Sequence, residues 1–183
     1  MDTKINRFLT YEDFIMLQLS VNIFQKQKVY NKLLRLIFLY ITKLGDGFLY
    51  AFLILFLIFS KSIYAKDLIL SFLFALAIER FAYFYVKNTV KRIRPYEKLK
   101  ISNIPFIPID RYSFPSGHTS AAFLFATIIS YYFPALILFI YLFALFVGIS
   151  RIVLNLHYPT DVIIGCIIGI ITGHTGLTLI KLL

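Results

Sequence analysis

A long apolar run, residues 119–150, constrains the chain most strongly because it contains no Asp, Glu, Lys or Arg. A helix needs about 20 apolar residues to cross a bilayer, so the run is too long for one comfortable span. Pro134 lies near its middle, where it would break a helix. We therefore predict two membrane spans, at about 117–133 and 135–153.

The composition also argues for a membrane protein. Hydrophobic residues make up 60% of the 183 residues and charged residues 15%, whereas a soluble domain has about a quarter charged residues. So small a globule lacks the interior to bury this much apolar surface, and a disordered chain would be more polar. The single cysteine, Cys166, excludes a disulfide framework and a cysteine-based zinc site. We expect it to be a buried packing residue.

Three further apolar stretches are long enough to span a membrane, and a shorter segment precedes them. Residues 11–26 alternate apolar and polar side chains at helical spacing, which predicts an amphipathic helix lying in the interface. The charges before it argue against a signal peptide. We therefore predict an all-α integral membrane helical bundle, a single domain over 1–183, with an interfacial segment at about 1–30 and a catalytic bundle at about 33–180. Its five spans include Leu33–Ser60, Leu68–Val86 and Val162–Ile180.

The predicted topology brings two polar segments together. Residues 87–118 join the second and third spans, and residues 151–161 join the fourth and fifth. An even number of crossings separates these segments, so both should lie on the same face of the membrane. Three clusters of polar residues lie within or next to them.

The first cluster is Lys87, six residues, then Arg94-Pro95. If the second helix continues past the interface, positions seven apart return to nearly the same face, and both cations can reach one anion. Pro95 would end that helix, because the residue before proline avoids the helical region. The alternative is that both side chains only extend from a helix end toward the interface.

The second cluster is Pro115-Ser116-Gly117-His118 at the start of the third span. Ser116 suits a helix N-cap, and the free backbone N–H groups that follow it can bind an anion. Gly117 would let a ligand approach the backbone, with His118 beside it. The alternative is an ordinary capped helix with an interfacial histidine.

The third cluster is Ser150-Arg151, five residues, His157, three residues, Asp161. An arginine at the end of a charge-free span is costly without an anionic partner. Pro159 fits the first position of the fifth span, which places Asp161 in its first turn. Asp161 could then orient one nitrogen of His157 and leave the other free to attack. The alternatives are a helix-capping acid and an interfacial histidine.

These three clusters, complete and in order, resemble the three-part signature of the type 2 phosphatidic acid phosphatase superfamily. The resemblance implies a core of about six helices, and it implies that His157 is a nucleophile that forms a phosphohistidine. It further implies that Asp161 orients His157, that His118 protonates the leaving oxygen, and that no metal or other cofactor is used. By the same resemblance the phosphate is held by Lys87, Arg94, Ser116, Gly117 and Arg151.

The expected function is therefore that of a lipid phosphatase in a bacterial inner membrane. Candidate substrates by resemblance are lipid A 1-phosphate, undecaprenyl diphosphate and phosphatidylglycerophosphate, with the first two favoured. A phosphotransferase would use the same nucleophile and stays open. Haloperoxidases that share the signature resemble larger soluble proteins, and the complete signature argues against a channel or scaffold. The expected partners are the phosphorylated lipid and the bilayer, with no nucleic acid, and no protein partner can be inferred.

Several residues outside the signature have predictions of their own. We expect His174 to be a hydrogen-bonded core residue, Arg80 to form an ion pair with Glu79 or Asp46 within the bundle, and Gly165 and Gly169 to allow close helix packing. Five further cations either bind a second phosphate or anionic head groups, or form a solvated basic rim: Lys91, Arg92, Lys98, Lys100 and Arg111.

The side of the membrane that carries the site is predicted differently by two arguments. The formal net charge is +10, and most Lys and Arg lie on the catalytic face, including Lys4, Arg7, Lys26, Lys28 and Lys32. The positive-inside rule would place that face in the cytoplasm. The resemblance places it in the periplasm. We expect the periplasmic face, because phosphate needs Lys87, Arg94 and Arg151 wherever the site lies.

Overall fold

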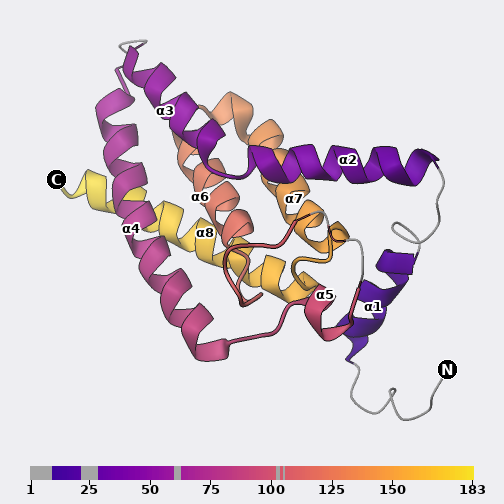
Figure 1. Ribbon diagram of the computed structural model, residues 1–183. Coiled ribbons are helices and arrows are strands. Elements are labelled where there is room, and N and C mark those ends of the chain that lie inside the picture. The colour runs from indigo at the N-terminus through magenta and orange to yellow at the C-terminus, as the bar shows by residue number, and fades with distance from the viewer. Residues whose placement is uncertain (1–9, 22–28, 60–62, 102–103, 105) are drawn as a thin grey trace.

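The computed structural model describes residues 10–21, 29–59, 63–101, 104 and 106–183, and the described residues are helical or irregular, with no strand. Lys4, Arg7, Lys26 and Lys28 lie outside them. The helices are α1 (Tyr11–Ser20), α2 (Val29–Leu44), α3 (Phe48–Phe59), α4 (Ala65–Val90), α5 (Pro95–Lys98), α6 (Gly117–Tyr132), the 3₁₀ turn η3 (Pro134–Leu136), α7 (Ile137–Val153) and α8 (Pro159–Lys181) (Figure 1).

The bundle is organised around α8, which packs along both α6 and α4, while α7 packs on the other side of α6. Two apolar clusters fill these interfaces. Leu68, Phe72 and Ala75 of α4 meet Leu124 and other residues of α6. A second cluster joins α6 to α7 through Ala122, Phe123, Ala126, Ala144 and Val147.

A line of glycines on α8 sets how closely the helices approach. A Cβ atom added at Gly165 would lie 2.6 Å from the carbonyl oxygen of Ser116, and one added at Gly169 would overlap the carbonyl oxygen of Ser120. At Gly176 the added atom would lie 2.5 Å from the carbonyl oxygen of Ser71 in α4. The close packing predicted at Gly165 and Gly169 is confirmed. It holds the first turn of α6 against α8.

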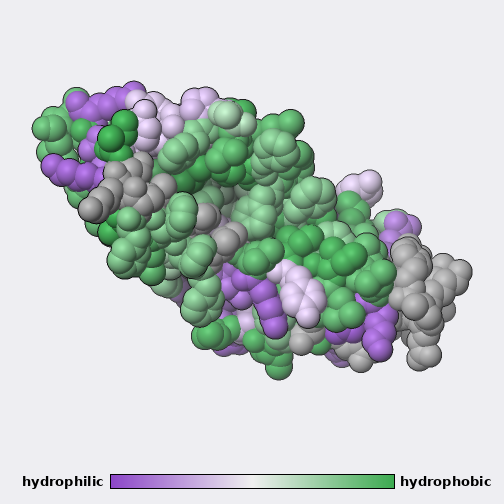
Figure 2. Space-filling model, turned by 90° about the horizontal axis from the view of Figure 1, so that it is seen from above, coloured by the Kyte–Doolittle hydropathy of each residue, from purple (hydrophilic) through white to green (hydrophobic). Residues whose placement is uncertain are grey.

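Three of the described helical segments are long and apolar enough to cross a membrane: Ala65–Lys98, Pro134–Val153 and Pro159–Lys181. The break predicted at Pro134 is confirmed, since α6 ends at Tyr132 and α7 begins after η3. Large apolar side chains also remain exposed around the bundle, among them Phe52, Phe56 and Phe139. Figure 2 shows apolar residues over most of the face seen from above, as expected of a surface that contacts lipid.

The prediction of one continuous helix at Leu33–Ser60 is wrong, because two helices, α2 and α3, occupy these residues. They meet at a turn in which Gly47 has φ +91, a conformation that favours glycine. With 16 and 12 residues, the helices are about 24 and 18 Å long at 1.5 Å per residue, each shorter than a hydrocarbon core of about 30 Å. Asp46 lies at this turn and faces the site described next.

Candidate active site

The three polar clusters lie together at one end of the bundle, where α4 and α7 end and α6 and α8 begin (Figure 1). Backbone and side-chain hydrogen bonds join them directly. The N–H of Ser116 donates to the carbonyl oxygen of Asp161 at 3.0 Å, and Arg94 Nη1 donates to the carbonyl oxygen of Leu156 at 2.7 Å. The predicted convergence of the two polar segments is therefore found in the structure.

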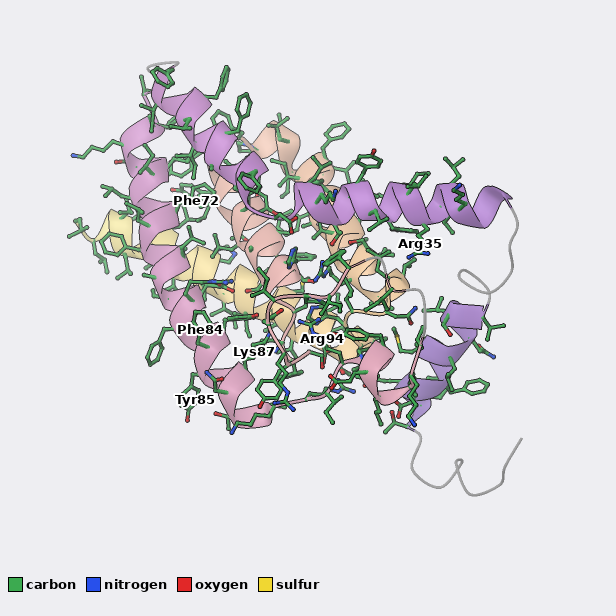
Figure 3. All side chains as sticks on the ribbon, viewed as in Figure 1. Arg35, Phe72, Phe84, Tyr85, Lys87 and Arg94 are labelled. Atoms are coloured by element: carbon green, nitrogen blue, oxygen red, sulfur yellow. The ribbon has the colours of Figure 1, made fainter. Side chains whose placement is uncertain are left out.

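Lys87 and Arg94 converge on one anion, although not from one helix. The expectation that α4 continues to Arg94 is wrong: it ends at Val90, Lys91 adopts a left-handed conformation, and Pro95 begins the short helix α5. Both cations are buried, and both form an ion pair with Asp110, Arg94 Nη2 at 2.7 Å from its Oδ1. Figure 3 shows Lys87 and Arg94 toward the polar end, while the exposed Phe84 and Tyr85 point away.

Asp110 was not predicted as part of the site, yet its carboxylate occupies the cation cluster. Besides Lys87 and Arg94, it accepts a hydrogen bond from the Tyr83 hydroxyl at 2.7 Å. Burial alone would raise the pKa of Asp110, but the charge of Arg94 and the hydrogen bond from Lys87 lower it well below its usual range. The cluster therefore holds an ionised carboxylate, a group that shares charge and acceptor geometry with phosphate.

The helix α6 begins at the predicted position, but the contacts of its first turn differ from those expected. Ser116 is the N-cap residue, but its hydroxyl pairs with Thr119 Oγ1 at 2.8 Å instead of capping the helix backbone. A Cβ atom on Gly117 would lie 2.8 Å from the ring of Tyr83. Gly117 thus leaves room for the tyrosine that binds Asp110.

His157 lies at the centre of the site, with its side chain 2% exposed. Its Nε2 lies 3.2 Å from Arg94 Nη1, and its Nδ1 lies 3.7 Å from Asp161 Oδ2. Burial, together with the charges of Arg94 and Arg151, holds the pKa of His157 well below its usual value near 6.5. The imidazole is therefore neutral at pH 7, with a lone pair available for attack.

Asp161 is fully buried and held on both oxygens. Its Oδ2 accepts the backbone N–H of Tyr158 at 2.8 Å, and its Oδ1 accepts Arg92 Nη1 at 2.8 Å. As predicted, Pro159 begins α8 and Asp161 lies in its first turn. The carboxylate stands on the Nδ1 side of His157, but the 3.7 Å separation is longer than a hydrogen bond.

Arg151 and His118 each have a partner from the α2–α3 region. Arg151 Nη1 donates to Thr42 Oγ1 at 2.6 Å, and its buried Nε has no hydrogen-bond partner among the described residues. His118 Nε2 lies 2.5 Å from Asp46 Oδ1. The hydrogen bond with His118 lowers the pKa of Asp46, so this carboxylate is ionised.

The residues outside the signature divide into confirmed and wrong predictions. Glu79 and Arg80 form the expected ion pair, at 2.5 Å. The core position predicted for His174 is wrong: it is exposed, because the next residue toward the N-terminus, Gly173, faces α6. Cys166 is half-buried, not fully buried.

Two of the five further cations, Arg92 and Lys98, are paired with acidic side chains. Arg92 pairs with Glu12 at 2.5 Å and with Asp161, and Lys98 pairs with Asp13 at 2.6 Å. Glu12 and Asp13 lie on α1, far away in sequence. Lys91 and Lys100 are exposed.

The comparisons with known proteins agree on one family. The family model of the PAP2 superfamily matches residues 68–181. A lipid A 1-phosphatase of Porphyromonas gingivalis is 43% identical over 68 residues, which make up 35% of this chain and 15% of that protein. The matched part is thus a small share of that relative's length.

Two solved structures share the fold over nearly the whole chain. The crystal structure of Aquifex aeolicus LpxE has a TM-score of 0.69 and 28% identity, covering 93% of this chain and 99% of that one. The first transmembrane PAP2 type phosphatidylglycerolphosphate phosphatase from Bacillus subtilis has a TM-score of 0.67, 21% identity, and coverage of 97% and 90%. At this identity the second likeness concerns the fold alone.

Proposed function

We propose, because this chain belongs to the PAP2 superfamily, that it is an integral membrane lipid phosphatase that acts through a phosphohistidine. The observation that carries the proposal is the surroundings of His157. Its Nε2 faces Arg94, which together with Lys87 already binds the carboxylate of Asp110. A phosphate that replaced this carboxylate would present its phosphorus to the imidazole.

The proposed reaction has two displacements at phosphorus. His157 Nε2 attacks, the bond to the lipid oxygen breaks, and His118 gives that oxygen its proton. Water then attacks the phosphohistidine and gives a proton to His118, the P–N bond breaks, and phosphate leaves with neutral His157 and protonated His118 regenerated. Positive charges and backbone N–H groups stabilise the charge that develops on the phosphoryl oxygens. These groups come from Lys87, Arg94, Arg151 and the Ser116–Gly117 turn.

A rapid-quench experiment tests the covalent step. Enzyme mixed with lipid carrying a ³²P-labelled terminal phosphate should become labelled within one turnover, with the label stable in base and lost in acid, as expected of phosphohistidine. The His157→Gln variant should carry no label, while His118→Asn should still accept it, slowly. Label that persists in a folded His157→Gln variant would contradict the nucleophile.

For the substrate we propose lipid A 1-phosphate or undecaprenyl diphosphate. The support is the match to a lipid A 1-phosphatase and the coverage of LpxE. Phosphatidylglycerophosphate hydrolysis and phosphoryl transfer to a second lipid are the alternatives. A panel of the three lipids, scored for free phosphate and for label transferred to an acceptor lipid, separates these outcomes.

We also propose that catalysis needs no metal ion. Within the described residues, no three His, Cys, Asp or Glu side chains gather so as to bind one, and Lys87, Arg94 and Arg151 would repel a cation. Phosphate release should survive dialysis against EDTA, and vanadate should inhibit it. Activity that is lost on chelation and restored by Mg²⁺ or Zn²⁺ would overturn this proposal.

The chain is proposed to cross the bacterial inner membrane five times, with the site on the periplasmic face. The first crossing would then lie between the α2–α3 turn, where Asp46 meets His118 at the site, and the start of α4 at the opposite end of the bundle. Lys100 is exposed beside the site and offers a reporter position. In a Cys166→Ala background, Lys100→Cys should react with a membrane-impermeant thiol reagent in intact cells. Protection until the cells are lysed would place the site in the cytoplasm.

A further inference from the structure

The N-terminal helix α1 presents two adjacent acids, Glu12 and Asp13, to the segments that carry the nucleophile. Figure 1 shows α1 beside α5, at the end of the bundle where the polar clusters lie. Asp13 is fully buried although it belongs to the first turn of a short helix. A buried carboxylate is costly unless its partners are fixed, so the docking of α1 is specific.

Glu12 binds both the start of α8 and the arginine that holds Asp161. Its Oε1 accepts the backbone N–H of Thr160 at 2.9 Å, in the first turn of α8. Its Oε2 lies 2.5 Å from Arg92 Nη2. The other nitrogen of the same guanidinium, Nη1, donates to Asp161 Oδ1 at 2.8 Å. Arg92 therefore bridges an acid of α1 and the carboxylate beside His157.

Asp13 fixes the residue that follows the nucleophile. Its Oδ1 accepts the hydroxyl of Tyr158 at 3.0 Å, and its Oδ2 pairs with Lys98. The Tyr158 ring in turn lies under the guanidinium of Arg92, 3.9 Å from its central carbon to the ring centroid. Both acids thus act on one stack, formed by Arg92 and Tyr158.

We propose that α1 positions the nucleophile. Glu12 and Asp13 hold the Arg92–Tyr158 stack, and this stack fixes Asp161 against the Nδ1 side of His157. The inference rests on the proposed function, in which His157 attacks phosphorus. Glu12 and Asp13 touch no substrate in it and are positioning residues. Arg92 and Lys98, being engaged by α1, are not ligands for a second phosphate.

The expected loss of kcat follows from the contacts that Arg92 makes with two carboxylates. Its planar guanidinium spans two carboxylates, so its position is fixed from two sides. Without Glu12 the guanidinium keeps Asp161, Thr160 and the Tyr158 ring but loses the partner of its Nη2, so it can shift relative to Asp161. A displacement of a reacting group by about 1 Å can cost about 100-fold in rate. We expect smaller shifts here, and a loss of about tenfold in kcat.

A double-mutant cycle in the full-length enzyme tests the inference. Glu12→Gln should lower kcat about tenfold and leave KM and the vanadate inhibition constant within twofold, because the phosphate ligands are untouched. In an Arg92→Gln background the same substitution should have no further effect. Glu97→Gln is the matched control, since Glu97 is an exposed acid on α5 next to Lys98, and it should keep wild-type kcat.

Two results would overturn the positioning role. One is a Glu12→Gln enzyme that loses thermal stability but keeps its kcat per folded molecule. The other is an unchanged tenfold loss in the Arg92→Gln background, which would show that Glu12 does not act through Arg92.

A measurement without substrate separates this inference from the proposed function. In ¹⁵N-histidine-labelled enzyme, assigned with His157→Gln, the wild type should carry the His157 proton on Nδ1. Glu12→Gln should give a mixture of tautomers, and Glu97→Gln should not. If the wild type releases no phosphate from any lipid, the proposed function fails while the tautomer still decides the role of α1. An unchanged His157 tautomer in Glu12→Gln would overturn the positioning role of α1.

Discussion

The two histidines of the site lie in opposite surroundings. The side chain of His157 is 2% exposed and is approached by Arg94, whereas that of His118 is 31% exposed and binds the carboxylate of Asp46. The first environment keeps the imidazole neutral, because burial and nearby cations lower the pKa of His157. The second offers an ionised acceptor to one ring nitrogen and leaves the ring in reach of solvent.

This difference in surroundings supports the roles proposed for the two histidines. A neutral, buried imidazole suits attack on phosphorus. An imidazole that is hydrogen-bonded to a carboxylate and near solvent suits proton donation and recovery of that proton. Four substitutions test the contrast, from the largest expected effect to the smallest.

Replacement of His157 should have the largest effect. His157→Gln removes the nucleophile and should lower kcat about 1,000-fold or more. Phosphate release from the lipid panel measures it. A substrate with a better leaving group, such as an aryl phosphate, should not restore activity, because the missing group forms the new bond. Retention of more than about 5% of activity in a folded variant would contradict the assignment.

Replacement of His118 should have a smaller effect that depends on the leaving group. His118→Asn should slow release from an alkyl lipid phosphate by about 100-fold, a usual size for general acid catalysis. An aryl phosphate needs little protonation, so kcat for it should fall less than tenfold. The ratio of the two losses is the measurement. Equal losses on both substrates would mean that His118 does not donate the proton.

The residues that could be foreseen share a local pattern. Pro134 breaks an apolar run, and Gly165 and Gly169 repeat at helical spacing. The effect of each residue can therefore be predicted from its near neighbours in the sequence. The exposure of His174 could also have been foreseen. Successive residues of a helix point about 100° apart, so the neighbour of Gly173 turns away from α6.

The residues that could not be foreseen depend on long-range pairing. Asp46, Asp110 and Glu12 belong to no recognisable motif, and only the folded chain shows which cations they meet. The division of Leu33–Ser60 into α2 and α3 left a weak signal, since Asp46 stands between Gly45 and Gly47. A prediction based on hydrophobicity misses such a turn, because long apolar runs flank it on both sides.

Asp46 should support His118 without being essential. Asp46→Asn keeps the shape of the side chain but removes the charge that His118 binds at 2.5 Å. We expect kcat for the lipid substrate to fall about tenfold, the equivalent of about 1.4 kcal/mol. The aryl phosphate should be nearly unaffected, as for His118→Asn. Asp67→Asn, in the first turn of α4, is the control, and an equal loss in that variant would exclude a specific role.

Asp110 should give the smallest change, and the change should be a gain in binding. Its carboxylate neutralises Lys87 and Arg94 and must leave them when a phosphate enters. Asp110→Asn removes that competing charge while keeping the size of the side chain. A hydrogen bond to a charged group contributes about 1.5–3 kcal/mol. Because the Asn amide keeps part of it, we expect vanadate and inorganic phosphate to inhibit only about fivefold more strongly. Release of the phosphate product should slow by a similar factor, and kcat should fall wherever that step limits turnover.

Inhibition constants for vanadate, measured beside Glu97→Gln as the charge-matched control, decide the matter. Weaker inhibition in Asp110→Asn would mean that Asp110 orders the two cations for phosphate and does not compete with it. Each histidine would then depend on a nearby carboxylate, His157 on Asp110 and His118 on Asp46.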